Sequence, residues 1–145
     1  MENVKGLLSS DGGKTASYDA LNDYSSYVIT WRTLSIPKGD YDLYFDWKAM
    51  GKPSGTDAIY VYWVTDNTIE LKSDVAAMSI SSKYEPYFIG DTLSLAATWQ
   101  KAHFDVKNES SDSIRLVFIW NTDPENLQNP AACIDNIEIH KKNNC

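Results

Sequence analysis

Short segments in which apolar and polar side chains alternate are the feature of this sequence that most narrows its fold. The clearest is "YDLYFDW", residues 41–47, in which polar residues separate Leu43, Phe45 and Trp47. A period of two residues with one apolar face is typical of a half-buried β-strand, because successive side chains of a strand point to opposite sides. This segment is therefore predicted to be a strand with Leu43, Phe45 and Trp47 in the core.

Two further segments are apolar on both faces. They are "AIYVYWVT", residues 58–65, and "SIRLVFIWN", residues 113–121. Such segments are expected for strands that are covered on both sides or that line a groove. With residues 134–139 they complete a set of four predicted core strands, 41–47, 58–64, 114–120 and 134–139. Leu116, Phe118 and Ile137 are predicted to be buried in it.

Turn signals separate the strands. In "IPKG" Pro37 presets a turn and Gly39 can adopt a positive φ, which predicts a hairpin over residues 28–48. The polar segment "KNESSDS" joins "WQKAHFDV" to the strand over 114–120 and predicts a second hairpin. Residues 66–98 lack a sustained helical period and are predicted to be loops with short strands. The fold class is therefore predicted to be all-β, an antiparallel sandwich or jelly roll.

Composition limits the class of protein. A chain of 145 residues fits one domain over 1–145. The 43% hydrophobic and 12% aromatic content exclude a disordered chain, and the apolar runs are too short for membrane insertion. A net charge of -7 disfavours nucleic acid as a partner, because it repels phosphate backbones. The first residues lack the basic start and apolar stretch of a signal peptide, so we expect either a cytoplasmic protein or an excised piece.

The two cysteines carry no metal-binding spacing. Cys133 lies in an apolar segment and Cys145 ends the chain. We expect a buried free thiol and a frayed terminal one.

Catalytic motifs are weak in this chain. His103 and His140 lie in strand-like segments without a metal-binding or nucleophile motif around them. A glycosidase needs a pair of carboxylates, for which Asp46 and Asp57 are the first candidates. Solvated or turn-forming acids are the favoured interpretation of both, so we expect no enzyme and retain a polysaccharide-active enzyme as a minor alternative.

Aromatic residues are the stronger functional signal. Five tryptophans and nine tyrosines exceed what a small core needs, and a sugar ring can stack its apolar face on an indole or a phenol. The candidate ligand-binding residues are Trp31, Tyr60, Tyr62, Trp63 and Trp99. Core packing is the alternative for each of them, whereas Trp47 and Trp120 continue apolar faces and are assigned to the core.

The order of several segments resembles a known group of domains. "IPKGDYDLYFDWKAMG", "DAIYVYWV", a "WQ" ahead of a strand, "RLVFIWNTD" and "NPAACIDNIEI" follow one another between residues 28 and 140. This succession is similar to the jelly-roll domains of the MAM-like, cleaved-adhesin and choice-of-anchor J group. The resemblance implies an antiparallel two-sheet jelly-roll β-sandwich of galactose-binding-like or MAM-like type. The chain departs from the group's pattern at Cys133 and in having only Pro130 before it.

The resemblance also implies a function. Domains of this group occur mostly as modules of secreted or surface proteins of Bacteroidetes, where they look like binding or adhesion modules. We therefore expect a non-catalytic, monomeric carbohydrate-binding or adhesion module of a larger secreted or cell-surface protein, with its signal peptide excised. Its partner would be an extracellular glycan or surface polymer. The alternative is a structural or protein-interaction domain without a small ligand.

The segment "CIDNIEI" breaks the alternation. Simple alternation places Asp135 on the face of Ile137 and Ile139, whereas Ile134 falls on the other face. In domains of the resembling group this aspartate lies at a bulge, which inserts one residue and changes the alternation. A buried carboxylate there needs backbone amides, an arginine or a hard cation. Backbone amides are the favoured interpretation, and the alternative is a structural Ca²⁺, as in several branches of the group.

The other oxygen ligands of such a Ca²⁺ would come from the N-terminal stretch. Asp11 is the first candidate there, with Asp19 and Asp23.

Overall fold

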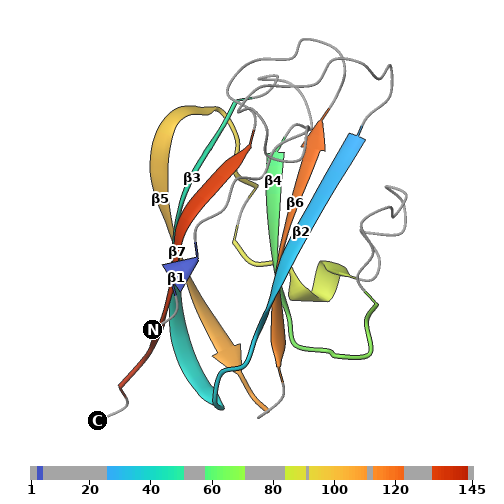
Figure 1. Ribbon diagram of the computed structural model, residues 1–145, viewed down its shortest axis with the longest axis vertical. Coiled ribbons are helices and arrows are strands. Elements are labelled where there is room, and N and C mark those ends of the chain that lie inside the picture. The colour runs from blue at the N-terminus through green and yellow to red at the C-terminus, as the bar shows by residue number, and fades with distance from the viewer. Residues whose placement is uncertain are drawn as a thin grey trace.

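The computed structural model describes residues 3–4, 26–50, 58–70, 84–90, 92–110, 113–122 and 132–143. Two antiparallel sheets lie face to face as a β-sandwich (Figure 1). The elements are β1 (Asn3–Val4), β2 (Ser26–Leu34), β3 (Gly39–Ala49), β4 (Ala58–Val64), η1 (Glu85–Tyr87), β5 (Ala96–Asn108), β6 (Ile114–Thr122) and β7 (Cys133–Lys141). The four-stranded sheet has the order β1-β7-β3-β5 and the three-stranded sheet β2-β6-β4. The prediction of an all-β sandwich is confirmed.

The core lies between the two sheets and is built as the alternation predicts. All four predicted core strands are present, within β3, β4, β6 and β7. The six side chains predicted to be buried are buried: Leu43, Phe45, Trp47, Leu116, Phe118 and Ile137. Rings from the two sheets meet in the centre, where Phe45 and Phe118 form an edge-to-face pair with their centroids 5.3 Å apart. This geometry is the one that aromatic quadrupoles favour.

The thiol of Cys133 is buried, as the sequence predicted. Burial raises the pKa of this thiol, because a charged thiolate is poorly solvated there. Cys145 lies outside the described residues.

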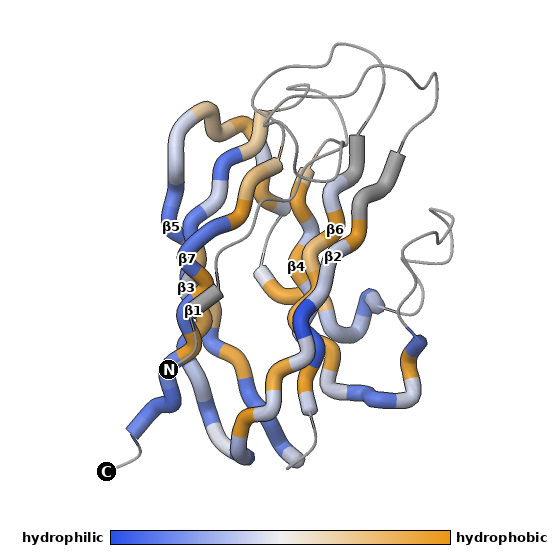
Figure 2. Tube along the Cα trace, in the orientation of Figure 1, coloured by the Kyte–Doolittle hydropathy of each residue, from blue (hydrophilic) through white to orange (hydrophobic). Residues whose placement is uncertain are grey.

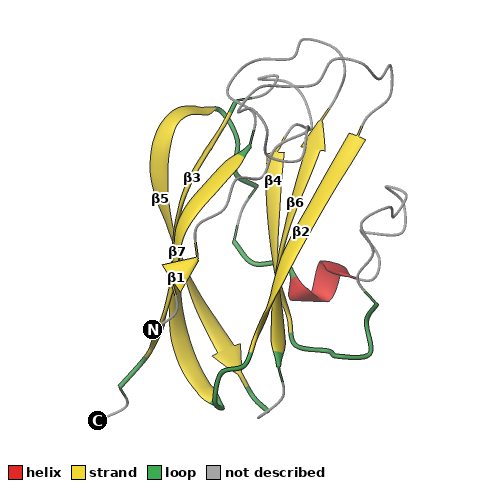
Figure 3. Ribbon diagram, viewed as in Figure 1, coloured by secondary structure: helices red, strands yellow, loops and turns green. Residues whose placement is uncertain are grey.

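Both predicted hairpins are wrong. β2 pairs with β6, whereas β3 pairs with β5 and β7, so residues 35–38 cross from one sheet to the other. β5 and β6 likewise belong to different sheets. Figure 3 shows both crossings at the same end of the sandwich. Turn residues specify that the chain reverses, but which strands pair depends on how both apolar faces are buried.

Polar contacts fix these crossings. The Tyr41 hydroxyl donates to the carbonyl oxygen of Pro37 at 2.6 Å, in the manner of the tyrosine corner of other sandwiches. Asn108, only 1% exposed, donates to the carbonyl oxygen of Ile36 at 3.0 Å and accepts from the amide of Ser110 at 3.2 Å. Asn108 therefore ties the two crossings together.

Gly39 begins β3 with a φ of +153°, as predicted, although in a crossing rather than a hairpin. A Cβ at this position would lie 2.9 Å from Cε of Lys141. The flexible end of Lys141 could move aside, so it is the backbone conformation that favours glycine here.

The change of alternation near the C-terminus is a β-bulge, as the sequence predicted. Tyr44 is paired with Glu138 and Asp46 with Asp135, so β7 contains one residue more than β3 over this interval. The left-handed φ of +52° at Asn136 accommodates that residue. The bulge brings Ile134, Ile137 and Ile139 to the core side. Asp135 is only half-buried and does not share their face, which corrects the expectation of a buried carboxylate.

Hydrophilic residues recur along β3, β5 and β7, whereas β4 consists mostly of hydrophobic and weakly polar residues (Figure 2). Against the outer face of the three-stranded sheet lies a second apolar cluster, formed by Tyr62, Val64, Tyr84, Val117 and Ile119. This confirms that the segments apolar on both faces are covered on both faces. Phe88 and Leu93 also pair with the edge of β4, at Tyr62 and Ile59. Ile59 and Leu93 exchange two backbone hydrogen bonds of 2.9 and 3.0 Å.

Candidate functional site: a pocket at the edge of the sandwich

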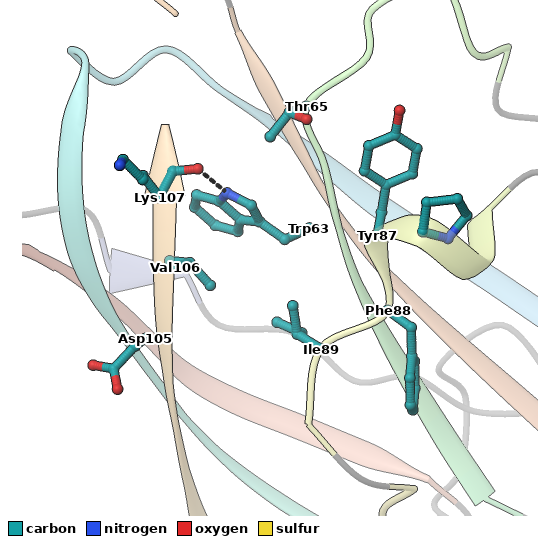
Figure 4. Close-up of a pocket in the computed structure, with 9 residues that line it drawn as sticks. Trp63, Thr65, Tyr87, Phe88, Ile89, Asp105, Val106 and Lys107 are labelled. Carbon is teal, nitrogen blue, oxygen red and sulfur yellow. Dashed lines mark hydrogen bonds between the residues drawn. The ribbon is translucent and has the colours of Figure 1, made fainter. Parts of the chain in front are cut away.

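A pocket of about 300 Å³ lies where the edge strands of the two sheets meet. One wall comes from β4 and the segment around η1, and the other comes from β5 (Figure 4). The lining residues are Trp63, Thr65, Pro86, Tyr87, Phe88, Ile89, Asp105, Val106 and Lys107. Aromatic and aliphatic groups make up most of this lining, with a few polar groups, which is the usual composition of a small-molecule site.

Trp63 forms the floor between the two sheets. It points inward from β4, is 5% exposed and donates its indole N-H to the carbonyl oxygen of Lys107 at 3.1 Å. This hydrogen bond joins β4 of one sheet to β5 of the other and fixes the ring (Figure 4). Because Trp63 is 5% exposed, it can offer a ligand only a small part of its ring surface, and its N-H is not available as a donor.

The segment around η1 belongs to the same wall as β4 and faces β5. The amide of Ile89 donates to the carbonyl oxygen of Val61 at 3.0 Å, which fastens this segment to β4. Phe88 is 36% exposed and rests on two tyrosines, with centroid distances of 5.5 Å to Tyr62 and 6.2 Å to Tyr60. The Phe88 ring therefore lies on the outer side of β4, away from the inward-pointing Trp63 (Figure 4).

Polar groups lie around the opening. Thr65 supplies a hydroxyl, and Lys107 supplies an ammonium group that lies 3.7 Å from a carboxylate oxygen of Glu109. A second hollow of about 280 Å³ adjoins the first and is lined by Thr65, Lys107, Glu109 and Ser110. A ligand in the pocket could thus combine contact with rings and hydrogen bonds to the rim. The volume lies at the lower end of the range for ligand pockets, roughly 300 to 1,000 Å³, which fits one small ring.

The five aromatic residues predicted to bind ligand do not form one surface. Trp63 lines the pocket, whereas Tyr60 and Tyr62 lie behind its wall, and Tyr62 is only 7% exposed. Trp31 and Trp99 are exposed, by 39% and 46%, but they lie on β2 and β5, in different sheets. This separation could not be predicted from the sequence, because the period of a strand does not tell which sheet the strand joins.

Tyr87, Phe88 and Lys107 were missed as site residues. They belong to the segments "YEPYFIG" and "KNESSDS", which were interpreted as irregular chain and as a turn. The only available signal for the first was its two tyrosines and phenylalanine beside a proline, which does not indicate what the segment packs against.

A polar cluster lies on the outer face of the four-stranded sheet. Nε2 of His103 is 2.7 Å from Oδ1 of Asp42 and 3.9 Å from Oδ1 of Asp105. The Lys142 ammonium lies 3.6 Å from Oδ1 of Asp42 and hydrogen-bonds directly to Asp105. Tyr44 stacks on the His103 ring at a centroid distance of 4.4 Å with an interplanar angle of 9°. The sequence did not predict this cluster, because its members are far apart along the chain.

The charges of this cluster stabilise one another. The hydrogen bond from His103, with the nearby Lys142, holds the pKa of Asp42 below its usual value of 3.8. The hydrogen bond to Asp105, with the charges of both carboxylates, raises the pKa of Lys142 above its usual 10.5. All four groups are solvent-accessible, so water and salt weaken these interactions.

At the bulge, Asp135 accepts a hydrogen bond from the backbone amide of Asn136 at 2.8 Å. The Asn136 side chain donates to Oδ2 of Asp46, also at 2.8 Å. Asp135 thus has one backbone amide as a partner, that of the next residue in the same strand. The calcium prediction stays a prediction, because Asp11, Asp19 and Asp23 lie outside the described residues.

The predicted glycosidase pair also stays untested. Asp46 contacts Asn136 and lies 4.0 Å from the Lys101 ammonium, on the outer face of the four-stranded sheet. Asp57 lies outside the described residues.

No family model matches the chain, and no curated protein matches it. Within the described part of the chain, no helix has the length and apolar character needed to cross a membrane.

Proposed function

We propose that this protein is a non-catalytic carbohydrate-binding or adhesion module that holds a sugar ring in the pocket between β4 and β5. The observation that carries the proposal is the pocket itself, an open hollow of about 300 Å³ with Trp63, Tyr87 and Ile89 in its lining and polar groups around it. A pyranose ring has apolar C-H faces and a belt of hydroxyls. It therefore suits a site in which rings and hydrogen-bonding groups are close together.

The expected affinity is modest. Stacking on one aromatic ring contributes about 0.5 to 1.5 kcal/mol beyond area burial, and the pocket accommodates one ring rather than a long chain. Several copies or neighbouring modules in a parent protein would raise the effective affinity. This fits a jelly-roll module of the MAM-like or choice-of-anchor J group in a secreted or cell-surface protein, a placement supported by the resemblance of the sequence.

One observation favours the alternative of a protein-interaction domain. Trp31 is 39% exposed on β2 and is paired with Val117, which belongs to the second apolar cluster. An exposed indole beside apolar side chains is a common anchor at protein interfaces.

Fluorescence titration with soluble oligosaccharides and polysaccharides tests the proposal. The double variant Trp31→Phe/Trp99→Phe removes the two most exposed indoles, so that a remaining ligand-dependent change points to an interior tryptophan such as Trp63. Ile89→Ala removes an aliphatic side chain that points toward Val106 across the pocket (Figure 4). It should weaken glycan binding roughly tenfold, since each buried CH₂ group contributes about 0.8 kcal/mol.

Thr68→Ala is the control, because this side chain lies on the same connection but outside the pocket lining. Glycan binding that is equally strong in Ile89→Ala would contradict the assignment to this pocket. Absence of any glycan response, together with loss of a protein partner in Trp31→Ala, would establish the interaction domain instead.

A further inference from the structure

Three potential metal-ligand atoms come together on the outer face of the four-stranded sheet. They are Nε2 of His103 and one carboxylate oxygen each of Asp42 and Asp105, all within 4.8 Å of one another. The cluster is mixed in chemistry, because it combines an imidazole with two carboxylates. Imidazole nitrogen together with carboxylate oxygen is a donor set that suits Zn²⁺ and its neighbours among the divalent transition metals.

The spacing of these atoms is close to what such an ion needs. Bonds of about 2.0 to 2.2 Å in a tetrahedral arrangement place ligand atoms roughly 3.3 to 3.6 Å apart. Nε2 of His103 lies 2.7 Å from Asp42 and 3.9 Å from Asp105, distances on either side of this range. Small changes in side-chain torsion, without movement of the backbone, would therefore bring the three atoms to bonding distance.

The backbone beneath the cluster is regular strand. Asp42 and Asp105 are direct partners in the β3–β5 ladder. Tyr44 and His103 are partners two residues further along, on the same face of the sheet. The stack of Tyr44 on His103 restrains the imidazole plane. Ligands on paired strands are held more precisely than ligands on loops, so the entropy lost on metal binding is small.

A cation already occupies this position. The ammonium of Lys142 contacts both carboxylates, and it reaches them from the segment just after β7. Its backbone amide donates to the carbonyl oxygen of Asp40 at 2.8 Å, which keeps the chain in place. The side chain alone can thus rotate into solvent while the main chain stays bound.

We propose that Asp42, His103 and Asp105 form a binding site for a divalent transition metal ion of the zinc type, with Lys142 as a tethered cation that competes for it. Three protein ligands leave one coordination position open to solvent. The site is separate from the proposed glycan pocket, although Asp105 borders both, because the Asp105 carboxylate points away from Phe88 and Ile89 (Figure 4).

Isothermal titration calorimetry of the full chain with Zn²⁺ tests this proposal. The titration is carried out on a Cys145→Ser background, so that the terminal thiol does not contribute. One equivalent should bind, and His103→Ala should weaken binding at least tenfold. Lys142→Met should tighten binding roughly tenfold or more, since it removes one positive charge about 4 Å from the ion.

His140→Ala is the matched control. His140 lies on the same face and also packs against Tyr44, but within the described residues it is paired with a single carboxylate, that of Glu138 at 3.6 Å. Its replacement should leave Zn²⁺ affinity unchanged. The proposal is overturned if Lys142→Met binds no Zn²⁺ at millimolar concentration, or if His103→Ala and His140→Ala have equal effects. Circular dichroism of each variant establishes that the fold is retained.

Discussion

The outer faces of the two sheets are built in opposite ways. On the four-stranded sheet the outward side chains of β3, β5 and β7 are mostly charged and form ion pairs with one another, such as His103 with Asp42. On the three-stranded sheet the outward side chains are apolar and form a second cluster around Val117 and Ile119. The first face is exposed to water, whereas protein covers much of the second.

The difference explains the long connection between β4 and β5. Tyr84 packs into the second apolar cluster, and Ile69 and Tyr87 pack against it. Arg115 on β6 donates to the carbonyl oxygen of Asp66 at 2.6 Å and holds the start of this connection in place. The connection therefore acts as a partial third layer, and it also supplies one wall of the pocket. A sheet that is apolar on both faces needs such a cover, because a large exposed apolar face would associate with other molecules.

The largest expected effect lies between the sheets and not on either outer face. Phe118→Ala should lower the free energy of unfolding by about 3 to 5 kcal/mol, since it leaves a cavity beside Phe45 in the core. Urea unfolding of the variant measures this loss. Trp99→Ala, which removes a larger but 46% exposed ring, is the control and should cost much less. A loss below about 1 kcal/mol for Phe118→Ala would place this ring outside the core.

The second prediction compares the outer faces directly. Val117→Thr puts a hydroxyl on the covered face, at a residue that is 0% exposed, and should cost about 1 to 3 kcal/mol. Glu138→Thr introduces a threonine on the charged outer face of the four-stranded sheet, where the Glu138 side chain is 34% exposed. It should change the free energy of unfolding by less than about 0.5 kcal/mol. Thermal or urea unfolding measures both changes. Equal losses of stability in the two variants would mean that the two outer faces are equally shielded from water.

Much of the fold was predictable from sequence, because the order of apolar and polar residues within a strand indicates which of its faces are buried. The alternation around Phe45 and the continuous apolar run around Trp63 state which faces are buried, and both interpretations are confirmed. The pairing of strands was not predictable. Pro37 and Gly39 mark a reversal but carry no information on whether the next strand joins the same sheet.

The candidate site was harder to predict than the fold. Trp63 stood out as an aromatic residue, but its neighbour Lys107 comes from a strand in the other sheet. The zinc-type cluster likewise joins Asp42 to His103, which are 61 residues apart. Such proximity follows from sheet order and register, which local periodicity does not determine.

The third prediction uses pH to separate the faces. The pKa of Asp42 is lowered in the folded state, first by its hydrogen bond with His103. A lowered pKa contributes stability above the unfolded value of 3.8, and this contribution is lost as the pH falls through the lower folded value. Asp42→Asn should therefore flatten the loss of stability on acidification.

Urea midpoints measured between about pH 2 and 5 give this slope. Val117→Thr is the control, because a change on the covered face should lower the whole curve without changing its slope. An unchanged acid slope in Asp42→Asn would show that the charged face does not contribute to acid unfolding.

The smallest effect is expected at the bulge. It tests whether the Asp135 carboxylate, on the exposed outer face of the four-stranded sheet, is bound by a protein group or by a metal ion. Asp135→Asn keeps an oxygen that can accept the amide hydrogen of Asn136, so the loss should stay within about 0.5 to 1 kcal/mol. Melting curves in EDTA and in millimolar calcium should then coincide for the wild-type chain. If Asp135 instead binds Ca²⁺ together with Asp11, removal of the ion should lower the melting temperature by several degrees, since about 1 kcal/mol corresponds to 2 to 8 °C. In that case Asp135→Asn and Asp11→Asn should each abolish the effect of calcium.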